Sequence, residues 1–143
     1  MAGIRELAVF AENKPGKIEK ITGVLAKEGI NILAISIAST NGFGIIKFIV
    51  DKMELAYQKL KENGFTVSLN EVLAIAMKDR PGQIHEIAQV LLKNEINMEN
   101  AYVFVEETRK QAYFIVQVKD IERAKSLLKK ENLKLYDEFE EEK

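Results

Sequence analysis

Residues 13–32 read NKPGKIEKITGVLAKEGINI, and residues 79–98 read DRPGQIHEIAQVLLKNEINM. The two stretches align without gaps at an offset of 66 (79 − 13 = 66), and nine of the twenty aligned pairs are identical. Because an internal repeat decides the architecture before any local propensity does, we interpret the chain as two copies of one unit. A further match, between residues 50–56 and 118–124, lies at an offset of 68, which indicates two extra residues between the middle strands of the second copy.

Each copy shows the same order of expected elements. In the first copy, apolar residues recur at helical spacing before a glycine that suits a helix end, at Ile18, Ile21, Val24 and Leu25. A second helix is expected over residues 52–63. Runs rich in β-branched residues predict four strands, over residues 4–12, 30–40, 43–51 and 65–70. The order βαββαβ is that of the ferredoxin-like split βαβ unit, so we predict an α+β fold with antiparallel sheets and both helices of each copy on one face.

The domain organisation follows from the repeat. We expect one domain over residues 1–70 and a second over residues 71–143, with the helices of the second copy near residues 81–94 and 121–132. Almost no linker separates the copies, and residues 68–71 must serve as the junction. Two domains joined so closely are expected to pack side by side.

Composition excludes several classes of function. Lys and Arg number 21 against 22 Asp and Glu, so no positive field favours nucleic acid or an anionic membrane. Without cysteine and with one histidine, the chain has no material for a disulfide, a thiol nucleophile or a zinc cluster, and we expect no metal and no cofactor. No apolar run approaches the roughly 18–20 residues that span a bilayer, and residues 1–12 do not resemble a secretory signal. We therefore expect a cytoplasmic protein.

The loop Asn13-Lys14-Pro15-Gly16 is the candidate ligand loop. A proline at the first helical position, followed by a glycine, leaves a helix N-terminus with unpaired N–H groups and partial positive charge, which suits a carboxylate. Asn31, where the chain leaves this helix, supplies another amide. The second copy has the equivalent positions Asp79, Gly82 and Asn97. Together these groups describe a site for a free amino acid.

A purely structural interpretation of the same residues remains open. Asn13 and Asp79 can satisfy backbone N–H groups near a helix start. Asn31 and Asn97 can order the turn between helix and strand.

The chain resembles the ACT domain family, the amino-acid-binding regulatory modules of amino-acid metabolism. The resemblance rests on Glu12-Asn13-Lys14-Pro15-Gly16 followed by Gly29-Ile30-Asn31-Ile32, and two copies cover nearly the whole sequence. The pattern is similar to that of serine-sensing domains of phosphoglycerate dehydrogenase and of acetolactate synthase regulatory subunits. The resemblance implies an effector bound at the interface between ACT domains, with Asn13 and Asn31 contacting it and Gly16 allowing close approach.

The sequence departs from that pattern at three positions. Ala11 stands where serine-binding members often have a histidine, so serine itself is not implied. The second copy has Asp79 for Asn13 and Glu95 for Gly29, and a carboxylate at position 79 repels an effector carboxylate unless it meets the ammonium group. We expect the first copy to supply the better ligand loop and the second to complete the pocket.

Two competing classes are less well supported. Residues 42–48, GFGIIKF, resemble the third strand of an RNA-recognition motif, but Ile45 stands where an aromatic ring stacks on a base, and the charge is balanced. His85 is the single candidate base for catalysis, and no triad, metal cluster or phosphate loop accompanies it. We therefore expect no enzyme.

The open face of the second sheet is expected to be apolar. Alternation places four large side chains there: Tyr102, Phe104, Tyr113 and Ile115. Since a monomer rarely leaves such a patch in water, we predict that it packs against another subunit, as an oligomer interface, or against another domain, with scattered surface aromatics as the alternative. The sequence thus predicts a non-catalytic regulator that binds a free amino acid and forms a homodimer or higher oligomer, or alternatively a regulatory subunit acting mainly by contact with an amino-acid biosynthetic enzyme, like the acetolactate synthase small subunit.

Overall fold

The computed structural model describes residues 4–12, 14–105 and 111–136 of the 143-residue chain. The described residues divide into two compact units. One covers Arg5–Asn70, and the other covers the described residues from Glu71 onward together with Ile4. In the described ranges, no helix is both long and apolar enough to cross a membrane.

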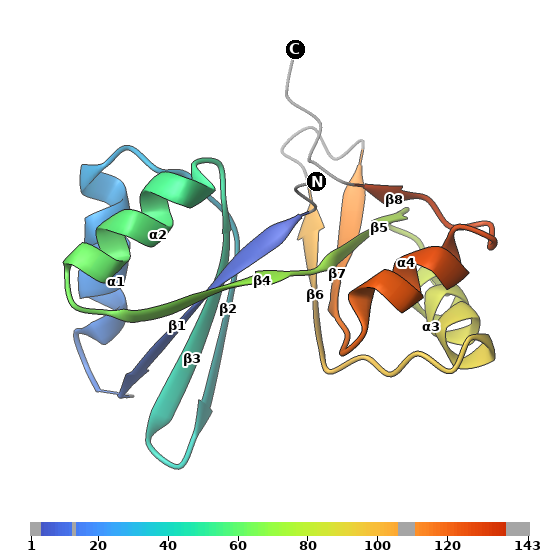
Figure 1. Cartoon of the computed structure of the whole chain (residues 1–143), viewed down its shortest axis with the longest axis horizontal. Helices are drawn as coiled ribbons and strands as arrows, with labels where there is room; N and C mark the ends of the chain where they lie inside the picture. The colour runs from blue at the N-terminus through green and yellow to red at the C-terminus, as the bar shows by residue number, and fades with distance from the viewer. Residues whose placement is uncertain (1–3, 13, 106–110, 137–143) are drawn as a thin grey trace. The chain divides into compact units, whose positions relative to one another are not determined.

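The first unit is a four-stranded antiparallel sheet with two helices on one face (Figure 1). Its strand order is β2-β3-β1-β4, which is the ferredoxin-like order. The elements follow the chain as β1 (Arg5–Glu12), α1 (Lys17–Lys27), β2 (Ile32–Thr40), β3 (Phe43–Val50), α2 (Met53–Glu62) and β4 (Thr66–Glu71).

The second unit repeats this arrangement with the strand order β6-β7-β5-β8 (Figure 1). Its elements are β5 (Leu73–Met77), α3 (Gln83–Lys93), β6 (Asn100–Val105), β7 (Ala112–Gln117), α4 (Ile121–Leu128) and β8 (Leu135–Tyr136). The predicted α+β fold of two βαββαβ units is therefore confirmed.

The register locates the two extra residues of the second copy. Ser36 pairs with Lys47 in the first sheet, and Tyr102 pairs with Ile115 in the second. Strands β2 and β6 thus align at a sequence offset of 66 (36 + 66 = 102), and strands β3 and β7 align at an offset of 68 (47 + 68 = 115). The insertion therefore lies between β6 and β7, where hairpin loops tolerate added length.

Equivalent residues build the two hydrophobic cores. In each unit, apolar side chains from the sheet and from both helices form one buried cluster. Matched pairs from the two clusters are Leu7 and Leu73, Ile21 and Ile87, Leu25 and Leu91, and Leu60 and Leu128. Each buried Leu or Ile side chain contributes about 1.5–3 kcal/mol to folding, so the repeated pattern alone accounts for the repeated fold. On the opposite face of the first sheet, the buried carboxylate of Glu6 has Lys47 Nζ at 3.7 Å from its Oε1.

Four boundaries differ from those expected. Helices α1 and α3 begin one residue after Gly16 and Gly82, which have φ values of 91° and 85°, so Pro15 and Pro81 belong to the preceding turns. A left-handed residue cannot continue a right-handed helix, and the helix starts after it. Helix α4 ends at Leu128 rather than at residue 132. Strand β4 continues through residue 71, so only Val72 separates it from β5, and the division between the two units falls between Asn70 and Glu71.

Candidate functional site

The two candidate ligand loops have the same backbone structure. In the first, the N–H of Lys14 donates to Glu12 O (2.9 Å), that of Lys17 to Lys14 O (3.3 Å) and that of Lys20 to Gly16 O (3.1 Å). The second loop repeats all three bonds at an offset of 66, from residues 80, 83 and 86 to residues 78, 80 and 82. No side chain caps either helix N-terminus within the described residues. Asn13 lies outside the described residues.

Ion pairs flank the two loops in different ways. In the first copy, Lys14 Nζ lies 2.6 Å from Glu12 Oε2, and this hydrogen bond lowers the pKa of Glu12 and raises that of Lys14. In the second copy, Arg80 Nη2 donates to Glu86 Oε2 at 2.8 Å and lowers the pKa of Glu86. Lys14 and Pro15, like Asp79 and Gly82, are exposed. Each loop therefore presents one local acid–base pair beside an open helix terminus.

The turn after α1 is fixed through backbone groups. The N–H of Asn31 donates to Asp51 Oδ1 at 2.9 Å, and the N–H of Asp51 donates to the carbonyl of Asn31 at 3.2 Å. Lys52 Nζ donates to the carbonyl of Gly29 at 3.1 Å. No hydrogen bond of the Asn31 side-chain amide is found within residues 4–12, 14–105 and 111–136. The side chain of Asn31 is therefore not what holds this turn.

Asn31 and the loop residues 14–16 do not lie together. Glu12 pairs with Phe43 at the hairpin end of the sheet, whereas Ile32, next to Asn31, pairs with Val50 at the other end. Phe43 and Val50 are seven positions apart on β3. At about 3.3 Å per residue, the two ends of the sheet are therefore about 23 Å apart. In the first unit, Asn31 and the described loop residues Lys14, Pro15 and Gly16 therefore lie at opposite ends of the sheet. The spacing in sequence concealed this, because the intervening helix carries the chain from one end of the sheet to the other.

Asn97, the equivalent of Asn31 in the second copy, lines a cavity of about 230 Å³. The cavity lies between the end of α3 and the start of α4. Its wall includes charges of both signs, from Glu95, Glu99, Lys119, Asp120 and Arg123. A free amino acid carries one carboxylate and one ammonium group, so this lining can pair with both.

Charge swaps between the copies explain why this cavity differs from the turn in the first copy. Where the first copy has Asp51 and Lys52, the second has Lys119 and Asp120. The long side chain of Lys52 reaches back to the turn, whereas Asp120 caps its own helix by accepting the N–H of Arg123 at 3.1 Å. Sequence reasoning missed Lys119, Asp120 and Arg123, although the aligned stretches 50–56 and 118–124 contain the swapped charges.

The expected apolar patch is only partly exposed. Register confirms that Tyr102 pairs with Ile115 and Phe104 with Tyr113, so these side chains share one face of the second sheet. Tyr113 and Ile115 are 0 % exposed in the single chain. The Tyr113 ring stacks on Phe104 with centroids 5.6 Å apart and meets Tyr136 edge to face at 5.0 Å. Its own neighbours thus cover Tyr113.

Exposed apolar residues occur instead on two edge strands. Strands β2 and β6 each lie at the edge of a sheet. Ile37 on β2 is 57 % exposed, and Val103, its equivalent on β6, is 41 % exposed. Edge strands with exposed β-branched side chains are surfaces on which another strand can add. The alternation of β2 and β6 could have shown this, but sequence alone did not identify which strands are edges.

Comparison with known proteins identifies relatives of the whole chain. The sequence model of the family described as "ACT domain pair" matches residues 2–143. The structure is similar to that of protein BT0572 from Bacteroides thetaiotaomicron, with a TM-score of 0.85 and 30 % identity over 94 % of this chain and 92 % of that one. The comparison with curated proteins finds no significant sequence match.

Two further structures share the fold at lower identity. One is the ligand-free regulatory subunit of aspartate kinase from Thermus thermophilus, with a TM-score of 0.63 and 18 % identity over 90 % of each chain. The other comes from a structure of aspartokinase alpha and beta subunits, with a TM-score of 0.58 and 18 % identity over 89 % of this chain and 91 % of that one.

Proposed function

The chain belongs to the family of paired ACT domains, and from this premise we propose that it is a non-catalytic cytoplasmic regulator that binds a free amino acid. ACT domains are regulatory domains. The observation that carries the proposal is the cavity at Asn97, because its size suits a small metabolite and its lining holds carboxylates, an amide and two cationic side chains. We propose that Arg123 and Lys119 pair with the effector carboxylate, and Glu95 with its ammonium group.

The effector site is proposed to form where two ACT domains meet. Within one domain, the candidate ligand loop before the first helix and the turn after that helix are about 23 Å apart. A small effector that contacts both a ligand loop and such a turn therefore needs them from different domains. Those domains can belong to one chain or to two copies. The exposed edge strands β2 and β6 favour association with a further copy, as a homodimer or higher oligomer.

The test is thermal denaturation with each of the twenty amino acids in turn. A ligand at about 100 times its Kd stabilises the folded state by about 2.7 kcal/mol, which raises Tm by several degrees in a chain of this size. We expect one amino acid, or a chemically related group, to raise Tm in the parent protein but not in Asn97→Ala. A shift that persists in Asn97→Ala places the effector elsewhere, and no shift with any amino acid contradicts effector binding by the chain alone.

A second candidate function is a regulatory subunit that acts by contact with an enzyme of amino-acid metabolism. The exposed apolar residues of β2 and β6 support it, as does the similarity in fold to regulatory subunits of aspartate kinase. If this is the main role, amino acids leave Tm unchanged, and replacing Ile37 and Val103 by Asp abolishes co-elution with the enzyme that the parent protein co-elutes with.

A further inference from the structure

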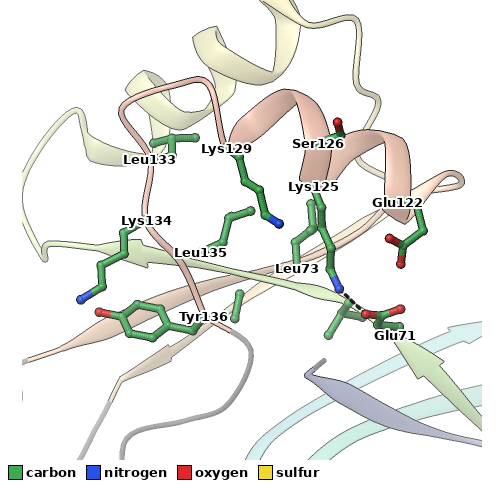
Figure 2. Close-up of a pocket in the computed structure, with 12 residues that line it drawn as sticks. Glu71, Leu73, Glu122, Lys125, Ser126, Lys129, Leu133, Lys134, Leu135 and Tyr136 are labelled. Atoms are coloured by element: carbon green, nitrogen blue, oxygen red, sulfur yellow. Dashed lines mark hydrogen bonds and ion pairs between the residues drawn. The ribbon is translucent and has the colours of Figure 1, made fainter. Parts of the chain in front are cut away.

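The second unit contains a larger groove that shares no residue with the cavity at Asn97. The groove has a volume of about 710 Å³ and lies between α4, the segment leading into β8, and the start of β5 (Figure 2). Its lining includes Val72, Leu73, Leu133 and Leu135 together with a larger share of polar and charged surface. Val72 and Leu73 are 1 % and 2 % exposed, so Leu133 and Leu135 supply the more accessible apolar side chains. Sites for small organic ligands have a volume of this size.

Five charged side chains border the groove and determine which ligand charge it favours. Three are cationic (Lys125, Lys129 and Lys134) and two are acidic (Glu71 and Glu122), which leaves one excess positive charge. Lys125 is committed to Glu71 through an ion pair. Lys134 lies 4.8 Å above the ring of Tyr136.

Lys129 is the cation best placed to meet a ligand. Its ammonium group points into the groove near Leu135, while Glu122 lies beyond the Lys125–Glu71 pair (Figure 2). Within the described ranges, no ion pair of Lys129 is found. An anion beside Lys129 is therefore separated from Glu122 by an ion pair that is already neutral.

The corresponding place in the first unit is built differently. Tyr57 stands at the position of Lys125 (57 + 68 = 125), and its ring packs against the first core. Strand β4 has six residues, whereas only two residues of β8 are described as strand. Lys61 occupies the position of Lys129, but its ammonium group lies over the Tyr57 ring at 5.0 Å. The open cation above apolar residues is thus a feature of the second unit.

From this arrangement we propose that the groove binds an organic anion with an apolar body, such as an aromatic or branched aliphatic carboxylate. The carboxylate lies beside Lys129, with Lys134 adding positive charge at the rim. The apolar body covers Leu133 and Leu135. This site is additional to the proposed amino-acid site, because it lacks a free carboxylate next to Lys129 for an ammonium group.

The test uses 2-naphthoate as the probe and 2-naphthalenemethanol as its uncharged counterpart. Binding of each compound is measured through the amide chemical shifts of the isotopically labelled full chain. We expect saturable shifts at Lys129, Leu133 and Leu135 with naphthoate, and binding at least about tenfold weaker with the alcohol, since each tenfold corresponds to about 1.4 kcal/mol. Lys129→Glu should abolish the saturable shifts.

Lys61→Glu is the matched control, because it makes the same change at the equivalent position of the first unit. It should leave naphthoate binding unchanged. The proposal is overturned if naphthoate shows no saturation at concentrations above about 1 mM, if its shifts fall outside the groove, or if Lys61→Glu and Lys129→Glu weaken it equally. Since the Asn97 cavity shares none of these residues, each of these results is independent of effector binding there.

Discussion

The backbone N–H of Asn31 donates to Oδ1 of Asp51 across 2.9 Å, and the carbonyl of Asn31 accepts the N–H of Asp51 in return. This reciprocal pair ties the end of α1 to the start of α2. The turn is therefore held by the Asp51 carboxylate and by backbone groups, and not by the side-chain amide of Asn31.

Asp51→Ala should therefore cost more stability than Asn31→Ala. Loss of the carboxylate removes one hydrogen bond to an N–H group, so we expect Asp51→Ala to lower the free energy of unfolding by about 1 kcal/mol. Asn31→Ala keeps the backbone bonds and should change it by less than about 0.5 kcal/mol. Urea denaturation of both variants measures the difference, and a larger loss in Asn31→Ala would assign the structural role to its side chain.

Asn97 is expected to matter for binding more than for folding. Asn97 is exposed and lines the cavity proposed for the effector. Once an amino acid that raises Tm is known, Asn97→Ala should weaken its affinity by about 1–3 kcal/mol, through one lost hydrogen bond to a charged group. Isothermal titration calorimetry gives the Kd. Asn31→Ala is the matched control, since Lys52 reaches across the equivalent turn, and it should leave the Kd unchanged.

The left-handed glycines before α1 and α3 should respond alike to substitution. Gly16 and Gly82 have φ values of 91° and 85°, and an added Cβ meets no atom within 4 Å at either position. Strain, not a clash, is thus the only penalty, and we expect Gly16→Ala and Gly82→Ala to destabilise the fold by about 1–2 kcal/mol each.

Gly23 supplies the control for this comparison. It lies inside α1, outside the left-handed region, and an added Cβ also meets no atom within 4 Å. Gly23→Ala should therefore stabilise the protein by about 0.5–1 kcal/mol. Thermal denaturation of the three variants checks the signs, and a stabilising Gly16→Ala would contradict the left-handed conformation of the loop.

Sequence predicted the repeat, the element order and the cores because these depend on periodic apolar residues, as at Ile21 and Ile87. Asn13 and Asn31 both flank the same helix in sequence, but the level of Asn31 in the sheet, beside Asp51, depends on register. The cavity at Asn97 depends on Arg123, a residue distant in sequence whose proximity only the fold creates. The ring contacts of Tyr113 with Phe104 and Tyr136 likewise come from pairing between strands, which alternation alone does not predict.

Glu95 is strained where its counterpart is not. It has a φ of 54° at the position that Gly29 occupies in the first copy with a φ of 68°. Left-handed backbone costs a side-chain-bearing residue about 1–2 kcal/mol, and a glycine loses about 0.5–1 kcal/mol in chain entropy. Glu95→Gly should therefore stabilise the fold by about 0.5–1 kcal/mol, whereas Gly29→Glu should destabilise it.

Glu95→Gly also tests the proposed effector site. If Glu95 pairs with the effector ammonium, Glu95→Gly raises the Tm of the free protein while reducing the further rise on adding the amino acid. A variant that is stabilised and still shows the full effector shift would remove Glu95 from the site but leave the cavity itself in place.

Arg80, on the loop before α3, should control the titration of Glu86 in the first turn of that helix. The hydrogen bond from Arg80 at 2.8 Å holds the pKa of Glu86 below its ordinary value. A carboxyl group with a lowered folded pKa stabilises the protein above its unfolded pKa, and this contribution is lost as the pH falls through the folded pKa. Carboxyl chemical shifts should show that Arg80→Ala raises the pKa of Glu86 toward its ordinary value, while the pKa of Glu12, held low by Lys14, stays unchanged. Lys14→Ala should do the reverse. If both carboxyl groups respond to either substitution, the two loops are electrostatically coupled, and the independence of the two acid–base pairs is refuted.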